Sequence, residues 1–509
     1  MKIEIDKISP QDIIDLMRRR EKQDIDLVTR AFEFAKETHE GVEQISGEPY
    51  FIRLYDTAKI LASIDSGSET IAAGLLHRTF ENPGVTVDIL KKEFGEEIAF
   101  LVERVSELGK LKYHGAKKHQ EGLRKLFVAM AQDIRVIVVK LALCLSNMEL
   151  LHFYDKDKQK EIAEETLEIF APIANRLGIG RLKKQLEDSA FPYVFPEEYK
   201  KVKELMKSRG SDTQKKLEKV YRTLQKKFAE ENVKVLKSDY RLKGLYSLYN
   251  KLSRHGMDIE KIYDISALRI IVAEVTDCYK VLGIIHSIWK PLPGRIKDYI
   301  ASKKPNGYQS IHTTVFTGET GAVEIQIRTL EMHREAEFGV ASHLSYKEKI
   351  NKENSGLMWV FKLIPLKLDF FRGNKQTEKN AKENDIPKWV KELAEFQLSN
   401  NKEKFIENLK ADFFKEQIFV FTPKGDVLDI PIESTPIDFA YAIHSDIGNH
   451  IFGAKVNGKF VALDTKLQNG DVIEIKTKPG SHPSEKWLQI AKTSFAQKQI
   501  RMALSEKNK

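Results

Sequence analysis

The spacing of apolar residues changes once along this chain, and the change separates two kinds of fold. From about residue 10 to 200 apolar residues recur at helical spacing, as in Leu27, Val28, Ala31 and Ala35, which predicts an all-helical domain. From about residue 233 they form short β-branched runs, ALRIIVAEV and AVEIQIRT, separated by helical segments such as DCYKVLGIIHSIW. This alternation predicts an α/β domain, and a chain of 509 residues is too long for one hydrophobic core.

The remaining sequence predicts a connector and a small β-rich module. Residues 346–386 are rich in Lys, Glu and Asn, which is typical of a connector. The module has turn signals between alternating runs, including Asn-Gly pairs at 457–458 and 469–470, and a helix is expected near 436–443. We place the helical domain at 1–200, the α/β domain at 201–346, the connector at 347–412, the module at 413–478 and a C-terminal helical segment at 479–509.

Composition excludes several classes of protein. The net charge of +9 suits polyphosphate ligands or RNA without establishing either. The two cysteines, Cys144 and Cys278, lie far apart in the sequence, so no disulfide framework is expected and a reducing cytoplasm is the simplest location. The most apolar stretch, VIVVKLALCL, is too short to span a bilayer and contains Lys140. We interpret it as a buried helix and expect no membrane partner.

The segment PLPGRIKDYIASKKPNGYQSIHTTVF and the run after it have the most informative pattern. Side chains alternate along a strand, so Glu324, Gln326 and Arg328 share one face of AVEIQIRT. Tyr308 can provide an aromatic platform for a base. The expected phosphate-binding loop contains the basic residues Arg295, Lys297, Lys303, Lys304 and His312. A solvent-exposed strand face is the alternative for the strand alone, and the loop favours a nucleotide site.

Two carboxylates are candidates for a metal site. Asp264 precedes the first β-branched run and Glu324 lies on the later one. If those strands are adjacent, the carboxylates can hold Mg²⁺ against phosphate oxygens. A turn-capping Asp and a surface Glu are the alternative, and spacing alone does not separate the two interpretations.

The segment RLKGLYSLYNK adds a second basic group. Lys243 and Ser247 are spaced i, i+4, with Lys251 one turn further, which predicts that all three share one helix face. Arg241 precedes them and offers a guanidinium that can stack on a base. An ordinary solvated helix face is the alternative.

These segments resemble the long-form RelA/SpoT homologue family of alarmone synthetases and hydrolases. The similarity covers nearly the whole chain and includes IYDISALRIIV, PGRIKDYIASKKPNGYQSIHTTV and VEIQIRTLEMHREAEFGVASH. The resemblance implies a multidomain α plus α/β protein: an all-helical HD-type domain, a nucleotidyltransferase-like synthetase domain with a mixed sheet, and a small β-grasp TGS domain. It further implies transfer of pyrophosphate from ATP to the 3′-hydroxyl of GDP or GTP in the stringent response.

The resemblance also assigns roles in the synthetase domain. Asp264 and Glu324 would hold Mg²⁺, while Tyr308 would stack on guanine and Arg241 on adenine. Lys297 and His312 would be catalytic together with the two carboxylates. The other residues implied to bind nucleotide are Lys243, Ser247, Lys251, Arg295, Lys304, Asn306, Gln326 and Arg328.

One motif departs from the pattern of family members with a silent hydrolase. Those chains usually have an acidic Glu-x-Asp-Asp sequence where this one has Arg295-x-Lys297-Asp298, as in the bifunctional class. The preference between GDP and GTP therefore stays open.

In the HD-type domain the resemblance points to a degenerate hydrolase site. Family members bind Mn²⁺ through a His after GEPY, a His-Asp pair after Leu-Leu and an Asp in a KLADRLHNM-like helix, with a Glu-Asp pair for acid/base work. The corresponding residues in this sequence are Arg53, His77, Arg78, Leu143, Glu81 and Asn82. Guanidinium has no lone pair to offer a metal. We expect no Mn²⁺ and no hydrolysis here, with His77 as an ordinary core histidine.

The C-terminal module resembles a TGS domain, in which His444 matches a residue near the 3′ end of uncharged tRNA in ribosome-bound relatives. A helix-end cap is the alternative role for His444. Two other functions are considered for the chain. An RNA-extending nucleotidyltransferase lacks its Gly-Ser and Asp-x-Asp pattern around Asp264. A non-catalytic ribosome- or tRNA-binding regulator would be favoured if Asp264, Glu324 and Tyr308 did not converge.

Overall fold

The computed structural model describes most of the chain in two units. The described residues are 8–18, 21–109, 126, 129–130, 132–259, 262, 265–304, 306–318, 321–342, 417–425, 427–468 and 470–507. The expected connector at 347–412 and the candidate ligand Asp264 lie outside them. Contacts within the chain define one unit at residues 1–385 and another at 386–509, and each is described by itself.

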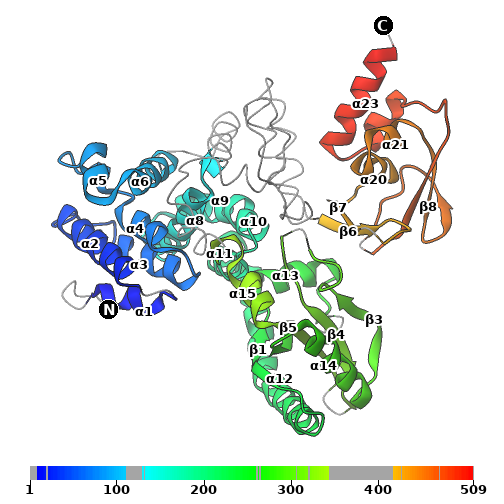
Figure 1. The fold of residues 1–509 in the computed structure, drawn as a ribbon, viewed down its shortest axis with the longest axis horizontal. Coiled ribbons are helices and arrows are strands. Elements are labelled where there is room, and N and C mark those ends of the chain that lie inside the picture. The colour runs from blue at the N-terminus through cyan, green and yellow to red at the C-terminus, as the bar shows by residue number, and fades with distance from the viewer. Residues whose placement is uncertain are drawn as a thin grey trace, which may run out of the picture. The chain divides into compact units, whose positions relative to one another are not determined.

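The first part of the first unit is helical, as the sequence predicts (Figure 1). Apolar residues at helical spacing become buried faces, for example Val28, Ala31 and Ala35. The stretch VIVVKLALCL lies in a largely buried helix, as expected, and Cys144 and Cys278 are free and buried. The helices are α1 (Pro10–Leu16), α2 (Lys22–Thr38), α3 (Phe51–Ser63), α4 (Ser68–Leu76), α5 (Val87–Phe94), α6 (Glu96–Gly109), α8 (Ile134–Met148), α9 (Lys156–Glu165), α10 (Ala171–Arg176) and α11 (Gly180–Val194).

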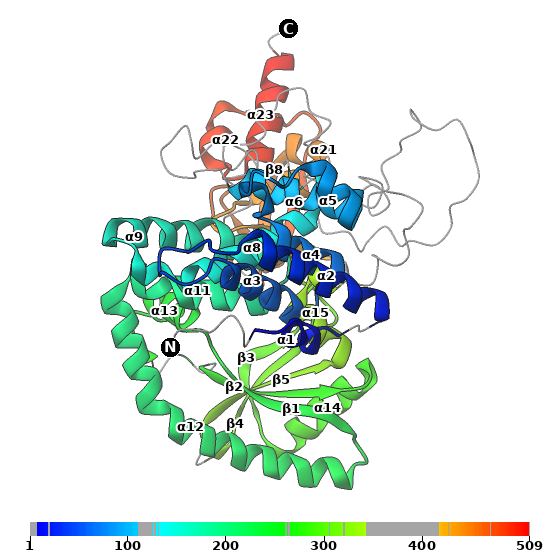
Figure 2. The ribbon, with the colours of Figure 1, turned by 90° about the vertical axis from the view of Figure 1, so that its left-hand side faces the viewer.

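A long helix, α12 (Pro196–Glu230), connects this part to the α/β part, and Figure 2 shows it running past the sheet. Pro196 stands at its first position, where the missing N–H costs no hydrogen bond. The expected domain boundary between residues 200 and 201 falls inside α12.

The α/β part contains a five-stranded mixed sheet in the order β1-β2-β5-β4-β3. Its central pair, β2 and β5, is parallel, and the other neighbours are antiparallel. This confirms the expected mixed sheet. The strands are β1 (Val235–Leu242), β2 (Ser266–Val272), β3 (Pro291–Asp298), β4 (Ile311–Phe316) and β5 (Ala322–Thr329), and the helices are α13 (Leu245–Arg254), α14 (Val275–Ile288) and α15 (Leu330–Phe338).

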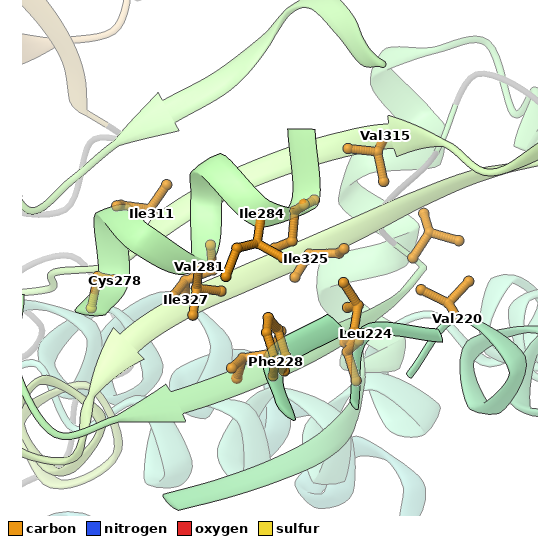
Figure 3. Packing of buried hydrophobic residues seen from close by; sticks show 14 of the residues in the cluster. Val220, Leu224, Phe228, Cys278, Val281, Ile284, Ile311, Val315, Ile325 and Ile327 are labelled. Atoms are coloured by element: carbon orange, nitrogen blue, oxygen red, sulfur yellow. The ribbon is translucent and has the colours of Figure 1, made fainter. Parts of the chain in front are cut away.

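One face of this sheet is the apolar core. Ile325 and Ile327 of β5 pack with Leu224 and Phe228 of α12 and with Val281 of α14 (Figure 3). Because side chains alternate along β5, the intervening Glu, Gln and Arg are directed to the opposite face. That opposite face forms the candidate site.

The second unit contains two small antiparallel sheets and four helices among its described residues. Asn457 and Gly458 adopt φ of 51° and 82° between β8 and β9, as the Asn-Gly signal predicts. A parallel bridge between Phe421 and Val472 joins the two-stranded sheet β6-β7 to the three-stranded sheet β10-β8-β9. The elements are β6 (Gln417–Phe421), β7 (Val427–Pro431), α20 (Pro436–Ile443), α21 (Ser445–Asn449), β8 (Ile451–Val456), β9 (Lys459–Val461), β10 (Ile473–Thr477), α22 (Glu485–Ile490) and α23 (Ser494–Lys507).

The C-terminal helices belong to the core of this second unit. Ala496 and Ile500 of α23 pack with Ile437 and Tyr441 of α20. The residues expected as a C-terminal helical segment are therefore packed on the module. Within the described part of the whole chain, no helix has the length and apolar character to cross a membrane.

Candidate active site

A cavity of about 1230 Å³ lies over the polar face of the mixed sheet. Its walls come from all five strands of the sheet, from α13 and α15, and also from α8 and α11 of the helical part. The cavity is large enough for more than one small ligand, since drug-sized pockets range from about 300 to 1,000 Å³.

A chain of hydrogen bonds joins five predicted site residues in this cavity. The Tyr308 hydroxyl lies 2.8 Å from His312 Nε2, and His312 Nδ1 lies 3.3 Å from Glu324 Oε1. Gln326 Nε2 donates to the same Glu324 oxygen over 2.8 Å. Gln326 Oε1 in turn accepts from the Arg241 guanidinium over 3.4 Å. Residues from three strands and one loop therefore converge on one carboxylate.

The protonation of His312 follows from these contacts. Burial lowers the pKa of His312, and the neighbouring Glu324 carboxylate opposes that shift only in part. A neutral ring with its proton on Nδ1 donates to Glu324 and leaves Nε2 to accept from the Tyr308 hydroxyl. Glu324 is thus placed as an acceptor of two hydrogen bonds.

Lys304 lies over the aromatic part of the site. Its ammonium is 4.4 Å from the ring centroid of Tyr299 and 5.1 Å from that of Tyr308. Burial lowers the pKa of Lys304 to about 8, and the charges of Lys297 and Arg241 lower it further. A cation held among other cations gains strongly from a bound polyanion.

Arg328 is the most deeply buried cation of the site, with an exposed fraction of 0%. Its guanidinium carbon lies 5.7 Å from the Tyr308 ring centroid. Among the described residues, none of its three side-chain nitrogens has a hydrogen-bond partner. Burial lowers the pKa of Arg328 to about 10. An unpaired buried guanidinium is costly, so an anionic ligand would stabilise it.

The expectation that Lys243, Ser247 and Lys251 share one helix face is wrong for Lys243. The helix α13 begins after Gly244, whose extended backbone makes it the N-cap. Lys243 precedes that cap, and its N–H donates to the carbonyl of Ile265. All three basic or polar side chains nevertheless line the same cavity.

The expected basic loop is also only partly a loop. Arg295 and Lys297 lie on β3 and His312 lies on β4, where Lys297 and His312 are direct partners. Their ladder has a register shift around Gly294, whose φ is 69°. This bulge lets a Pro- and Gly-containing segment pair as a strand. Lys304 remains in the connection between the two strands.

The same connection is attached to the helical part through Asn306. Its side-chain amide donates to the carbonyl of Asn175 over 3.2 Å, and its Oδ1 accepts from Tyr308 N over 3.3 Å. A Cβ at Gly178 would lie 2.7 Å from the Asn306 carbonyl oxygen. Gly178 therefore allows the close approach that fixes the Tyr308 loop.

Two further basic residues, Lys183 and Lys184 of α11, were missed from the sequence. Lys183 Nζ lies 3.3 Å from Ser247 Oγ, and Lys184 Nζ donates to the Leu242 carbonyl over 3.2 Å. Both line the cavity. The basic pair in GRLKKQLED could have indicated these two site residues. It lies, however, in the segment that was expected to belong to the helical domain only.

Of the two carboxylates expected to bind Mg²⁺, only Glu324 lies among the described residues. Ala267 of β2 pairs with Glu324 of the parallel strand β5, so the adjacency on which the Mg²⁺ prediction depends is confirmed. Asp264, three residues before Ala267, lies outside the described residues. Glu324 fits a Mg²⁺ site, because this ion commonly uses one or two carboxylates together with substrate phosphates.

The residues at the expected hydrolase positions are packed into the helical part. The Arg53 guanidinium donates to the carbonyl and the hydroxyl of Ser146. His77 Nδ1 lies 2.7 Å from the Gly74 carbonyl oxygen, and burial lowers the pKa of His77 to about 3. Leu143 is buried.

The neighbouring polar residues are also engaged by the protein. Arg78 donates to Glu81 over 2.6 Å, and its guanidinium carbon lies 5.5 Å from the Tyr50 ring centroid. Asn82 donates to the Thr38 carbonyl over 3.0 Å. Within the described ranges there is no group of three or more His, Cys, Asp or Glu side chains suited to a metal ion. His77 Nε2 is buried without a hydrogen-bond partner among the described residues.

In the second unit His444 stands between two helices. It ends α20 and caps α21, with its Nδ1 accepting from Asp446 N over 3.2 Å. The imidazole is exposed. His444 therefore caps α21. Its contact with tRNA stays a prediction.

Comparison with known proteins now identifies the family. A family model described as a region found in RelA/SpoT proteins matches residues 240–351, an HD domain model matches 31–180 and a TGS domain model matches 418–477. A guanosine-3′,5′-bis(diphosphate) 3′-pyrophosphohydrolase of Aquifex aeolicus is 42% identical over 509 residues, which are 99% of this chain and 68% of that protein. The chain belongs to the RelA/SpoT family. Its three expected fold types are thereby confirmed.

Other relatives of this RelA/SpoT chain are named for different activities. A GTP pyrophosphokinase of Myxococcus xanthus is 43% identical over 94% of this chain and 60% of its own length. The bifunctional (p)ppGpp synthase/hydrolase SpoT of Escherichia coli is 39% identical over 93% of this chain and 64% of its own length. The chain therefore spans less than two thirds of both relatives.

Among solved structures, the small alarmone synthetase 2 of Bacillus subtilis matches 29% of this chain and 83% of its own chain. The identity is 28% and the TM-score is 0.23. This TM-score is too low for a conclusion about the fold.

Proposed function

We propose that this chain is a (p)ppGpp synthetase, which transfers the β,γ-pyrophosphate of ATP to the 3′-hydroxyl of GDP or GTP. The observation that carries the proposal is the convergence of Tyr308, His312 and Glu324 in one hydrogen-bonded chain. Lysine and arginine side chains line the same cavity as these hydrogen-bonded residues. A carboxylate, an aromatic ring and several cations are the groups that a pyrophosphate transfer between two nucleotides requires.

In this reaction the acceptor 3′-oxygen forms a bond to the β-phosphorus of ATP. The bond from that phosphorus to the oxygen bridging the α-phosphorus breaks, and AMP leaves with the bridging oxygen. Glu324 is the described carboxylate at the centre of the site and accepts the proton of the 3′-hydroxyl. His312 donates to Glu324 and thereby orients it. In this proposal Tyr308 stacks on guanine and Arg241 stacks on adenine.

The cations provide most of the binding energy for the phosphates. Lys243, Lys297 and Lys304 line the cavity, and charge-assisted hydrogen bonds to phosphate are about twice as strong as neutral ones. A divalent ion held by Glu324 and Asp264, for which we propose Mg²⁺, would offset phosphate charge when bound. Alignment and charge neutralisation are the main sources of rate in this class of reaction.

The assay for this proposal uses the unmodified chain with ATP, Mg²⁺ and either GDP or GTP. We expect AMP and a 3′-pyrophosphorylated guanosine nucleotide in equal amounts. A chain that binds both nucleotides but forms neither product would instead be the non-catalytic regulator considered from the sequence.

We infer that the HD domain does not hydrolyse the 3′-pyrophosphate and holds no Mn²⁺. Arg53 and Arg78 occupy predicted ligand positions and remain charged at physiological pH, and Leu143 offers no donor atom. Asn82 cannot exchange a proton as a carboxylate would. Measurement of pyrophosphate release from the alarmone with Mn²⁺ tests this inference.

For the second unit, we propose that the TGS domain contacts uncharged tRNA or the ribosome through His444. The exposure of this imidazole between α20 and α21 supports the proposal. Weaker binding of uncharged tRNA to His444→Ala than to the unmodified chain is expected, and equal binding would contradict the contact.

A further inference from the structure

One face of α11, a helix of the helical part, lies against the connection between β1 and α13. The residues of this face are spaced i, i+3, i+4 and i+7, which places them on one side of the helix. They are Lys184, Glu187, Asp188 and Phe191. Each of them contacts residues 242–249, a segment that carries part of the synthetase site.

The first turn of α13 receives its cap from this face of α11. The N-cap residue of α13 is Gly244, which has no side chain to accept from the free N–H groups of the turn. Asp188 takes that role, because its Oδ1 accepts from Tyr246 N over 3.2 Å. A carboxylate at this end of a helix is also favoured by the helix dipole. Asp188 therefore caps α13 from a distant part of the sequence.

The glycine at the N-cap is explained by the same contact. The backbone of Gly244 has φ of −61° and ψ of 146°, which any residue can adopt. A Cβ at this position, however, would lie 3.0 and 3.1 Å from the two carboxylate oxygens of Asp188. Helices usually have Ser, Thr, Asp or Asn at this position. Here the close approach of Asp188 requires a glycine, and Asp188 supplies the missing acceptor.

Two further side chains of α11 hold the same segment. Lys184 Nζ donates to the Leu242 carbonyl over 3.2 Å. The buried Glu187 accepts from the Ser247 hydroxyl over 2.9 Å and forms an ion pair of 2.8 Å with Lys183. The segment from Leu242 to Ser247 is therefore bonded to α11 at both ends as well as at the cap.

We propose that Asp188 is a positioning residue of the synthetase site, which fixes the β1–α13 connection so that Arg241 and Lys243 face ATP. The proposal rests on the proposed synthetase function, in which Arg241 stacks on adenine. Lys243 directly precedes the capped Gly244, and both cations line the cavity. Tyr308, the proposed guanine platform, lies in a different connection, between β3 and β4. Loss of the cap should therefore affect ATP more than the guanine nucleotide.

The test compares the full unmodified chain with Asp188→Ala. Loss of a helix cap predicts that the KM for ATP rises by about five- to tenfold, while the KM for GDP stays nearly unchanged. Amide hydrogen exchange at Tyr246, measured without nucleotide, should become faster, because this N–H loses its acceptor. Asp188→Asn keeps a side-chain oxygen that can cap a helix. It should restore both the KM for ATP and the slow exchange.

Asp155→Ala is the matched control. Asp155 caps α9 in the same way, by accepting from Lys158 N over 2.9 Å, and it does not line the synthetase cavity. This variant should leave the KM for ATP unchanged.

Three results would overturn the proposal: unchanged exchange at Tyr246 in Asp188→Ala, a KM for ATP that does not rise more than the KM for GDP, or an Asp188→Asn variant as impaired as Asp188→Ala. Absence of AMP from the unmodified chain would instead overturn the synthetase function. The exchange measurement needs no activity, so it would still decide whether Asp188 caps α13.

Discussion

Two cavities of the first unit, one over the mixed sheet and one in the helical part, differ in the residues that line them. In the mixed-sheet cavity a carboxylate, Glu324, accepts from His312 and Gln326 and is surrounded by cations. A cavity of about 410 Å³ in the helical part is lined by Arg53, Arg78 and Lys140 together with Glu43 and Glu165. Among the described residues no cluster suited to a metal ion is found. We propose that the first site holds a metal ion and polyphosphate and that the second holds no metal ion.

The helical part keeps its packing around the residues at the expected hydrolase positions. The helices α3, α4 and α8 keep buried apolar faces around the degenerate residues. Arg53 is itself buried and satisfied by Ser146. We propose that the substitutions at the expected ligand positions prevent hydrolysis while the helical part still folds.

Replacement of the central carboxylate should give the largest effect. Glu324→Gln keeps the size of the side chain but cannot accept a proton or neutralise a metal, so we expect AMP formation to fall by about 10³-fold. The control is Glu331→Gln, because Glu331 is exposed on α15 and outside the cavity. Near-normal synthesis by Glu324→Gln would remove the carboxylate from the mechanism.

Loss of the aromatic platform should give the next effect. Tyr308→Ala should weaken binding of GDP by about 1 to 3 kcal/mol, the range for loss of one stacked base, and should weaken ATP binding much less. Tyr308→Phe keeps the ring and loses the hydroxyl contact to His312, so it should bind GDP nearly as well as the unmodified chain. Titrations that show equal weakening for the two nucleotides would contradict the assignment.

A smaller effect is expected from pH. Because the pKa of Lys304 is lowered to about 8, the ammonium that attracts phosphate is mostly present at pH 7 and mostly lost at pH 9. The nucleotide KM should therefore rise by up to about tenfold over this interval. In Lys304→Arg the rise should be absent, because guanidinium stays charged. The same rise in both chains would assign the pH dependence to another group.

The smallest effect is expected from restoring hydrolase ligands. Single changes such as Arg78→Asp should give no pyrophosphate release, since one new donor leaves the ion under-coordinated beside a remaining guanidinium. The combination Arg53→His, Arg78→Asp, Leu143→Asp and Asn82→Asp should give slow turnover at most, because supporting contacts such as that of Arg53 with Ser146 were built for other side chains. Full hydrolysis after a single change would show that the ligand positions are wrongly assigned.

The sequence predicted those elements that local pattern determines. The run AVEIQIRT matches β5 (Ala322–Thr329), and the helix expected near 436–443 matches α20 (Pro436–Ile443). The grouping of Glu324, Gln326 and Arg328 on one face followed from the same alternation. These predictions needed no knowledge of the tertiary structure.

Other features depended on contacts between distant segments. Lys243 was placed on a helix because spacing alone does not show that Gly244 is an N-cap. The contributions of Lys183 and Lys184 depend on how α11 packs against the β1–α13 connection. Arg328 was predicted to bind nucleotide, but only the structure shows its burial against Tyr308.

One reaction tests the difference between the two cavities most directly. The unmodified chain is incubated with ATP and GDP in a buffer with both Mg²⁺ and Mn²⁺, and nucleotides and pyrophosphate are followed over time. We predict that AMP and 3′-pyrophosphorylated GDP accumulate together and that the alarmone persists without release of pyrophosphate. Failure to form AMP would contradict the synthetase site, and formation followed by Mn²⁺-dependent loss of the alarmone would contradict the silent hydrolase.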